Sequence, residues 1–394
     1  MKARYRFRFY PTDQQRQSLA QLFGCCRVVW NDALALCKLS EKLPGFNKLS
    51  AMLTQAKETE ERKWLSDVSA VPLQQSLRKL DVAYKNFFSS LKGKRKGRKV
   101  GTPNFKKKTN EQSAEFTKAA FSVKHGIVYL AKIGDLKPIW SRDLPSEPSS
   151  VTVIKDCAGR FFLSFVVEVN PNKFCAKNKS IGIDLGIKTF AVMSNGEEVK
   201  SPSYSKADRK IRKLQRKLAR QQKSSKRRNQ TRIRVAKLHN QIADTRKDFL
   251  HKLSTKVVTE NQTIVLEDLN VSGMVKNRNL SRAISLQGWR EFRCLCESKS
   301  EKMGRDFRTI SRWEPTSQVC SDCGFKWGKL DLSIRQIVCI NCGAEHDRDS
   351  NAAKNIEMVG MGHWHDLKWT QRDGKTTPVA QPDEASRITV ASAR

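Results

Sequence analysis

Two pairs of cysteines in the last quarter of the chain constrain its folding more than any other feature. Two residues separate Cys320 from Cys323 and Cys339 from Cys342, and fifteen residues lie between the pairs. A glycine follows each pair and allows a tight turn there. Two such turns can present four thiolates tetrahedrally to one structural Zn²⁺ ion, which stabilises a segment too short to form its own core. The spacing predicts a zinc ribbon over residues 316–345.

A redox role for these cysteines would require a different pattern, a single CxxC after a strand in a thioredoxin-like unit. The chain has eleven cysteines, an odd number, and no secretory signal precedes them, which favours reduced thiols in a cytosol over disulfides. We expect the remaining seven to be core residues: Cys25, Cys26, Cys37, Cys157, Cys175, Cys294 and Cys296.

The charge of the chain indicates its partner. Its 394 residues include 75 Lys plus Arg against 39 Asp plus Glu, a formal net charge of +36. A charge of this size attracts long polyanions, and nucleic acid is the expected partner. No run approaches 18 apolar residues, so no membrane span is expected. A cytoplasmic protein, nucleoid-associated when bound to DNA, is the predicted location.

Three carboxylates that are far apart in the sequence occupy related local settings. Asp184 lies in a short apolar run closed by glycine, and Glu267 ends a second run rich in β-branched residues, so both runs are expected to be buried strands. Asp349 opens a segment whose residues favour the start of a helix. Two strand ends and one helix start can converge. Three such carboxylates can hold two Mg²⁺ ions about 4 Å apart, the arrangement that hydrolyses phosphodiesters.

Each of these acids also has a simpler interpretation. The GIDLG segment around Asp184 occurs in actin-like and heat-shock-type ATPases as well, although no Walker-type loop is present. Glu267 could be an ordinary strand-end acid, and Asp349 a helix N-cap. Asp347 competes with Asp349 for the third position. We interpret Asp268 either as a solvated acid at the end of the strand or as a residue that supports Glu267.

Two strongly basic segments are expected to contact nucleic-acid backbone. The first, residues 92–108, is a loop rich in Gly, Lys and Arg. The second, residues 206–237, holds fifteen Lys or Arg and one acid, Asp208, on a thin helical apolar seam. A solvated helix face would carry mixed charges, whereas one sign this dense repels itself unless a polyanion is bound. The candidate contacts are Lys94, Arg95, Lys96, Arg98, Lys99, Lys106, Lys107, Lys226, Arg227 and Arg228.

The order of motifs along the chain resembles one family. The motifs are YRFRFYPT (5–12), FGCCRVVWN (23–31), GIDLG (182–186), LEDL (266–269), TSQVCSDCG (316–324) and HDRDSNAAKNI (346–356). Together they resemble TnpB, the transposon-encoded RNA-guided DNA endonucleases related to type V CRISPR effectors. The resemblance covers residues 1 to 356, and the ordered combination is far more specific than any single motif.

The resemblance implies an α+β multidomain fold: a split β-barrel wedge with a helical recognition insertion, an RNase H-like (RuvC) α/β nuclease domain and a zinc-ribbon insert. The expected boundaries are wedge 1–10 and 93–178, helical recognition domain 11–92, nuclease 179–315 with a basic antiparallel helical pair at 203–250, zinc ribbon 316–345, last nuclease helix 346–360 and a flexible tail 361–394.

The resemblance also implies the partners and the activity. A guide RNA derived from the transposon end pairs with double-stranded target DNA, and the protein reads a short motif beside the target. In the family the catalytic acids match Asp184, Glu267 and Asp349, with two Mg²⁺ ions. The alternative is a nuclease-inactive RNA-guided repressor of the same fold.

A third possibility is a transposase that rejoins DNA. His363-Trp364-His365 matches a metal-binding motif of some transposases, but these enzymes also need a nucleophilic tyrosine. The five tyrosines are distant in the sequence, and none lies in a recognisable partner motif. Cleavage by the three acids is therefore the favoured prediction.

Overall fold

A computed structural model describes residues 1–95, 97, 99–171, 173–331 and 333–363 of the chain. Outside these residues lie two candidate backbone contacts, Lys96 and Arg98. The predicted tail from Trp364 onwards, which includes Trp364 and His365 of the possible transposase motif, also lies outside them. The chain divides into two compact units. Unit 1 comprises Met1–Val169 with Lys213–Lys237, and unit 2 comprises Asn170–Arg212 with the chain from Leu238 onwards. Helices and several sheets occur together, which confirms the expected α+β multidomain class.

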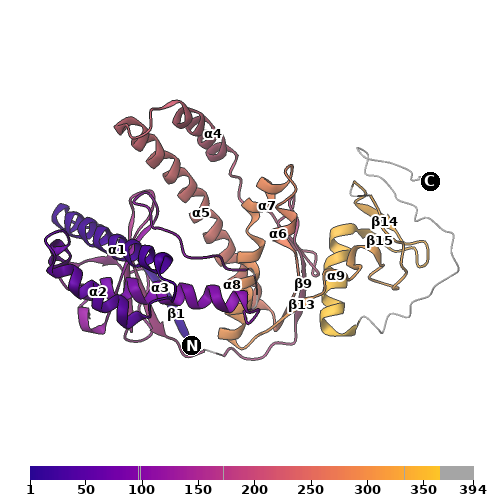
Figure 1. Cartoon of the computed structure of the whole chain (residues 1–394). Coiled ribbons are helices and arrows are strands. Elements are labelled where there is room, and N and C mark those ends of the chain that lie inside the picture. The colour runs from indigo at the N-terminus through magenta and orange to yellow at the C-terminus, as the bar shows by residue number, and fades with distance from the viewer. Residues whose placement is uncertain (96, 98, 172, 332, 364–394) are drawn as a thin grey trace. The chain divides into compact units, whose positions relative to one another are not determined.

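The first strand of unit 1 pairs with strands from much later in the sequence (Figure 1). β1 is antiparallel to both β8 and β6, in a five-stranded sheet of order β2-β7-β8-β1-β6. A three-stranded sheet of order β3-β4-β5 accompanies it. The strands are β1 (Lys2–Phe9), β2 (Gln112–Thr117), β3 (Phe121–Lys124), β4 (Ile127–Leu130), β5 (Gly134–Leu136), β6 (Pro138–Ile139), β7 (Ser150–Lys155) and β8 (Phe161–Glu168).

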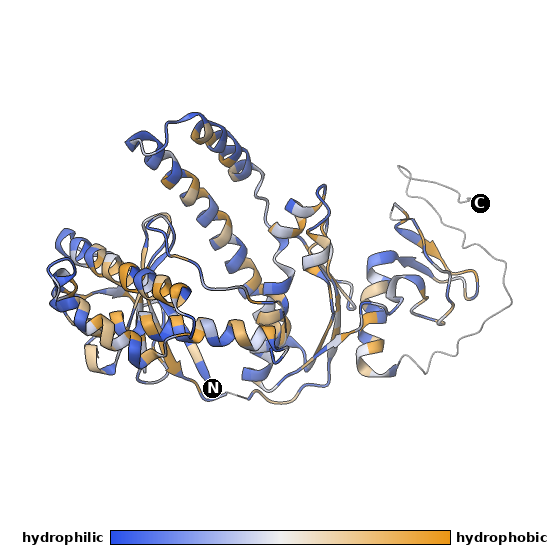
Figure 2. Cartoon of the chain, viewed as in Figure 1, coloured by the Kyte–Doolittle hydropathy of each residue, from blue (hydrophilic) through white to orange (hydrophobic). Residues whose placement is uncertain are grey.

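A group of helices is inserted between β1 and β2. They are α1 (Asp13–Leu39), α2 (Phe46–Glu58), α3 (Ala70–Leu91) and the short 3-10 helix η1 (Lys63–Asp67), and a second 3-10 helix, η2 (Lys118–Ala120), follows β2. Thr12 and Gln15 cap the start of α1 reciprocally, each side chain accepting a backbone N–H of the other residue. The apolar faces of α1 and α3 alternate with polar ones (Figure 2) and share one buried core with Phe7 and Phe9 of β1. Helices and sheet therefore stabilise one another.

Unit 2 is built on a sheet of order β11-β10-β9-β12-β13. β9, β12 and β13 are parallel, and β10 and β11 extend the sheet as antiparallel strands. The strands are β9 (Ser180–Asp184), β10 (Ala191–Met193), β11 (Glu198–Val199), β12 (Thr263–Glu267) and β13 (Asp306–Ile310). The near-continuous apolar sequences of β9 and β12 suit parallel strands that are covered on both faces.

Alternate residues of β9 and β12 enter different cores. Ile181, Ile183, Ile264 and Leu266 pack with residues of α5 (Lys226–Glu260) and α8 (Trp289–Met303). Val265 instead packs against Ile356 of α9 (Arg348–Met361). The remaining elements of unit 2 are α6 (Val271–Met274), α7 (Ser281–Gln287), η3 (Thr316–Gln318) and the hairpin of β14 (Gln336–Val338) and β15 (Glu345–Asp347).

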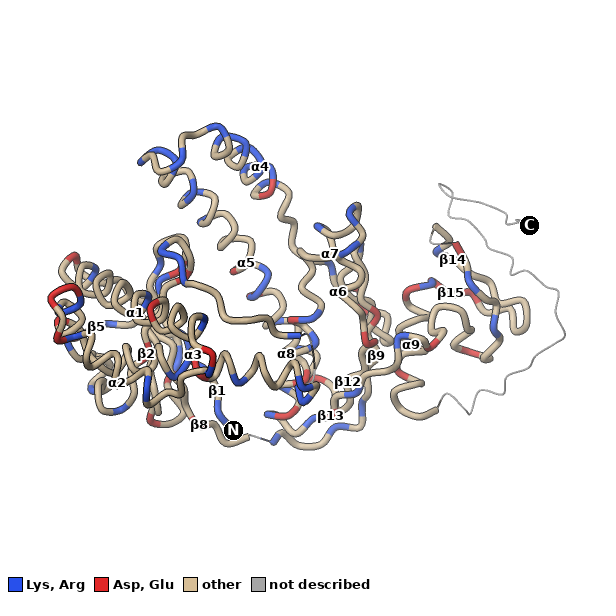
Figure 3. The backbone as a smooth tube through the Cα atoms, viewed as in Figure 1, with Lys and Arg blue, Asp and Glu red and all other residues tan. Residues whose placement is uncertain are grey.

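The second basic segment forms helices. α4 (Ser205–Arg220) is followed by α5, and Lys and Arg residues are dense along α4 and the start of α5 (Figure 3). The single acid of this segment, Asp208, is buried and forms ion pairs with Arg212 and Arg282. Among the described residues, no helix is both long enough and apolar enough to cross a membrane.

Candidate functional site

The first two predicted acids lie side by side at one edge of the unit 2 sheet. β9 and β12 are parallel and in register, with Leu266 opposite Ile183, so that Asp184 and Glu267 each follow at the carboxyl end of their strand. Both ends point to the same edge, because parallel strands share one direction. Sequence positions 83 residues apart are thereby adjacent in space.

Burial and neighbouring charges shape the electrostatics of this edge. Burial, followed by the charges of Glu267 and Asp349, raises the pKa of Asp184 from 3.8 to about 7. Burial also raises the pKa of Glu267. A hydrogen bond of 3.4 Å from the Thr316 hydroxyl acts in the opposite direction and lowers it. Ionising carboxylates that lie close together and partly away from water is unfavourable in free energy, and a bound cation offsets this.

The third acid reaches this edge from α9. The sequence suggested that Asp349 could be the N-cap, but the helix begins at Arg348 and Asp347 caps it. The Asp347 carboxylate accepts the backbone N–H groups of Asp349 and Ser350, at 3.0 and 2.9 Å. Asp347 is thus engaged with the backbone, whereas Asp349 in the first turn interacts electrostatically with Asp184.

A cation from the cysteine-rich segment is paired with Asp349. One guanidinium nitrogen of Arg335 donates to both carboxylate oxygens at 2.9 Å, and both side chains are partly exposed. Within the described ranges, no group of three or more carboxylates has one oxygen each within 4.8 Å of all the others. The three acids therefore converge on one edge without forming a closed metal cage, and Asp349 is held by Arg335.

Close backbone packing fixes α9 on the sheet. A Cβ atom at Gly182 would lie 2.2 Å from the Ala353 carbonyl oxygen, and one at Gly360 would lie 2.3 Å from a methyl carbon of Val265. Two buried amides of the same helix bind the chain that leads into the cysteines. Asn351 donates to the Val319 carbonyl at 2.8 Å, and Asn355 also donates to it, at 2.7 Å. These contacts hold Asp349 in place relative to β9.

The four predicted cysteines gather at one point. Their sulfur atoms all lie within 4.8 Å of one another, with 3.8 Å between Cys320 and Cys342 and 3.6 Å between Cys323 and Cys339. Tetrahedral zinc with Zn–S bonds of about 2.3 Å requires sulfur atoms about 3.8 Å apart. The thiols therefore fit a structural zinc ion.

The turns that present these thiols match the sequence prediction. Gly324 and Gly343 adopt positive φ, and their N–H groups bond back to the carbonyls of Cys320 and Cys339. His346, which sequence reasoning missed, places its Nε2 atom 3.0 Å from the Cys320 sulfur. A donor at this distance can orient and stabilise a metal-bound thiolate.

The prediction for the other cysteines was partly wrong. Cys25, Cys26, Cys37 and Cys296 are buried, but Cys157, Cys175 and Cys294 are exposed. Cys157 and Cys175 lie in connections outside the helices and strands, and Cys294 lies on an exposed side of α8, which the local sequence does not specify.

The candidate backbone contacts fall into two groups. Lys106 and Arg228 are partly buried, and the Lys106 ammonium lies 4.0 Å from the Trp30 ring centroid. Burial lowers the pKa of Lys106 to about 8. Asn31 fixes the same loop through hydrogen bonds with the Lys106 backbone at 2.8 and 3.1 Å. The others that are described are exposed: Lys94, Arg95, Lys99, Lys107, Lys226 and Arg227.

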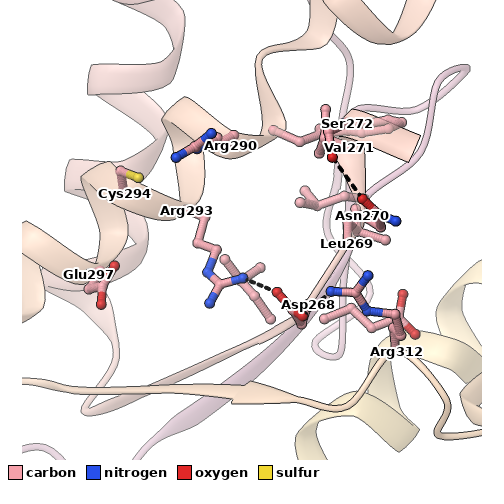
Figure 4. Close-up of a pocket in the computed structure, with 14 residues that line it drawn as sticks. Asp268, Leu269, Asn270, Val271, Ser272, Arg290, Arg293, Cys294, Glu297 and Arg312 are labelled. Carbon is pink, nitrogen blue, oxygen red and sulfur yellow. Dashed lines mark hydrogen bonds and ion pairs between the residues drawn. The ribbon is translucent and has the colours of Figure 1, made fainter. Parts of the chain in front are cut away.

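Asp268 has a defined role that its sequence position did not reveal. It follows Glu267 and forms ion pairs with Arg293 of α8 and with Arg312, just after β13 (Figure 4). Hydrogen bonds from Arg312 and Arg293 lower the pKa of its carboxyl. Asp268 is thus a counter-ion for two arginines that sequence reasoning missed, because they come from distant segments.

Comparisons with known families cover most of the chain. A family described as "Probable transposase" matches residues 164–278, and "Cas12f1-like, TNB domain" matches residues 289–356, which include the cysteines and Asp349. A "Helix-turn-helix domain" matches residues 1–40, where the structure instead has β1 and the single long helix α1.

Curated relatives match over nearly their whole length. A protein of Streptomyces pristinaespiralis named "Putative RNA-guided DNA endonuclease" is 42% identical over 92% of this chain and 90% of its own. "Putative RNA-guided DNA endonuclease InsQ" of Escherichia coli K12 is 30% identical over 90% of this chain and 92% of its own. The structure of a Cas12f1–guide RNA–target DNA complex matches with a TM-score of 0.55 at 14% identity, covering 91% of this chain and 98% of that one.

Proposed function

Because the chain belongs to the TnpB family, whose curated members are named as RNA-guided DNA endonucleases, we propose that it cuts DNA at a target selected by a guide RNA. Asp184, Glu267 and Asp349 are the proposed catalytic residues. The observation that carries the proposal is the placement of Asp184 and Glu267 at adjacent ends of parallel strands, where the charge of Asp349 also acts on Asp184.

The residues present suit divalent cations. Two neighbouring strand ends and one helix supply three carboxylates, of which Asp349 pairs with Arg335, and the charge of Arg348 also acts on Asp184. Hard divalent ions such as Mg²⁺ prefer carboxylate oxygen ligands. When bound, two Mg²⁺ ions would supply an activated water and stabilise the leaving oxygen. Asp184 and Glu267 would hold the metal from the rigid sheet, and Asp349 would complete the site after its carboxylate leaves Arg335.

The four thiolates have a structural part in this proposal. A zinc ion at Cys320, Cys323, Cys339 and Cys342 would hold the segment that carries Arg335 and leads into α9. The ribbon would in this way determine where Asp349 stands.

The partners follow from the charge and from the relatives. A guide RNA, which we expect to derive from the transposon end, and double-stranded target DNA beside a short motif are the proposed ligands. The net charge of +36 suits binding to both. We further propose a cytoplasmic location, associated with the nucleoid when DNA is bound.

A cleavage assay with the purified protein–RNA complex tests the proposal. Sequencing the copurifying RNA defines the matched DNA target. With Mg²⁺ the complex should cut this target, and Asp184→Ala should abolish cutting while RNA and DNA binding persist, since it removes a metal ligand and no nucleic-acid contact. Asp248→Ala on the exposed surface of α5 is the matched control.

Tight binding of the matched target without any cut would select the nuclease-inactive repressor instead. All three acids are present in this chain, which favours the nuclease. Retained cutting by Asp184→Ala would remove this residue from the site.

A further inference from the structure

A cleft borders Glu267 on the side of α8. Its volume is about 380 Å³, and it lies between the end of β12 and one face of α8 (Figure 4). Arg290, Arg293 and Glu297 lie at helical spacing on that face. Its charged lining residues are Glu267, Asp268, Arg290, Arg293, Glu297 and Arg312, which we call the arginine cleft.

The arginines of this cleft are accessible and only lightly held. Arg293 and Arg312 converge on Asp268 from two different elements, and the three side chains are 34%, 36% and 38% exposed. Ion pairs that are this exposed contribute little to stability, and their partners can be replaced readily. A phosphate group offers the same planar guanidinium forks more oxygen acceptors than a carboxylate does. Asp268 therefore occupies the position that an incoming phosphate would take.

An exposed tryptophan follows one of these arginines in the chain. Trp313 directly follows Arg312, so their Cα atoms are about 3.8 Å apart, and its side chain is 85% exposed. An exposed indole of this size is a platform on which an unpaired base can stack. Paired bases within a duplex do not offer a free face to it.

We propose that the arginine cleft and Trp313 bind the single DNA strand that is to be cut, with backbone phosphates on Arg293 and Arg312 and one base on Trp313. This inference rests on the proposed function, because it names the path of the substrate into that site. Bound phosphate displaces Asp268 from the arginines, and the strand continues toward Glu267, which lines the same cleft. Arg293, Arg312 and Trp313 position the substrate and take no part in the chemistry.

Photo-crosslinking tests the path without requiring cleavage. The full chain with its copurifying RNA, carrying Asp184→Ala, is mixed with the matched target in single-stranded form, with 5-iodouracil placed at successive positions. After irradiation, the crosslinked peptide is identified by mass spectrometry. We expect one position to crosslink to Trp313 and the crosslink to vanish in Trp313→Leu. Crosslinks confined to other segments, or Trp313 crosslinked by an iodouracil-labelled guide RNA instead, would overturn the proposal.

Variants of the cleft give opposite shifts in the same assay. The strand concentration for half-maximal crosslinking at Trp313 should rise about tenfold or more when Arg293→Gln and Arg312→Gln are combined, because two phosphate contacts are lost. Asp268→Asn should lower it several-fold, since both arginines are released. Lys252→Gln, which removes one positive charge at an exposed position of α5, should leave it unchanged.

The pair of shifts separates a binding role from a structural one. A cleft that only stabilised the fold would weaken crosslinking in both kinds of variant, and that result contradicts the proposal. The readout also separates this inference from the proposed function. A complex that crosslinks at Trp313 but cuts no DNA with Asp184 intact would refute cleavage alone, whereas a complex that cuts without this crosslink would refute the strand path alone.

Discussion

The carboxyl group of Asp184 should destabilise the metal-free protein, and Asp184→Asn should therefore make it more stable. The side chains have nearly the same shape, and an amide oxygen can still accept the backbone N–H of Leu185 that Asp184 accepts. What the substitution removes is the negative charge. In the wild type this charge is held beside Glu267 and Asp349 in a partly buried position.

The size of the effect follows from the raised pKa. A shift from 3.8 to about 7 corresponds to about 4 kcal/mol, because each pKa unit is about 1.4 kcal/mol. Between these two values the folded state holds a proton that the unfolded state has lost, so the free energy of unfolding of the wild type falls as the pH rises. The penalty is about 1.7 kcal/mol at pH 5 and reaches its full value of about 4 kcal/mol near pH 8.

Urea denaturation in EDTA measures this directly. The stability advantage of Asp184→Asn over wild type should grow by about 2.5 kcal/mol between pH 5 and pH 8. Asp248→Asn, which removes an exposed charge from α5, should change stability by less than about 0.5 kcal/mol at both values. Saturating Mg²⁺ should stabilise the wild type and not the variant. An advantage that does not depend on pH would refute the reasoning, since a charge-free packing effect has no such dependence.

Four further predictions concern the metal sites, packing and charge. The Mg²⁺ concentration for half-maximal cleavage should rise about tenfold per pH unit below pH 7 and level off above it, because Asp184 must lose its proton to bind metal; a flat profile would contradict this. Cys320→Ser should release zinc, measured by atomic absorption, while the exposed Cys157→Ser should keep it; unchanged zinc content would exclude the four-thiolate site. Gly182→Ala should cost roughly 1–3 kcal/mol in thermal or urea unfolding and displace Asp349, whereas Gly45→Ala, with open space around it, should be tolerated. Replacing Lys226, Arg227 and Arg228 by Gln should lower the salt dependence of RNA binding by up to about 2 in log–log slope, and an unchanged slope would remove these residues from the interface.

The strands and turns of the site could be predicted from the sequence because local patterns determine them. The continuous burial of β9 and β12 follows from their apolar runs, and both strands end at the acids that the sequence singled out. The two turns that present the thiols follow from the cysteine spacing and the glycines with positive φ. In these cases the informative residues are neighbours along the chain.

Contacts between distant segments could not be predicted in this way. The pairing of Arg335 with Asp349 and of Arg312 with Asp268 depends on where separate elements meet in space. The cap at Asp347 was missed because Asp347 and Asp349 are both good helix-start residues, and only the backbone geometry separates them. Gly182 did carry a signal, since a glycine inside an apolar strand marks close approach of another backbone.

The arrangement of α9 against Gly182 has a consequence for synthesis of the protein on the ribosome. Asp184 and Glu267 emerge early and can pair within the sheet, but Asp349 emerges only after the whole cysteine-rich segment. A chain released prematurely, or one that has not yet acquired its metal at the four thiolates, would thus lack the final carboxylate in position. Under the proposed function such a product would leave DNA intact, and the ability to cut would be the last property that the maturing chain acquires.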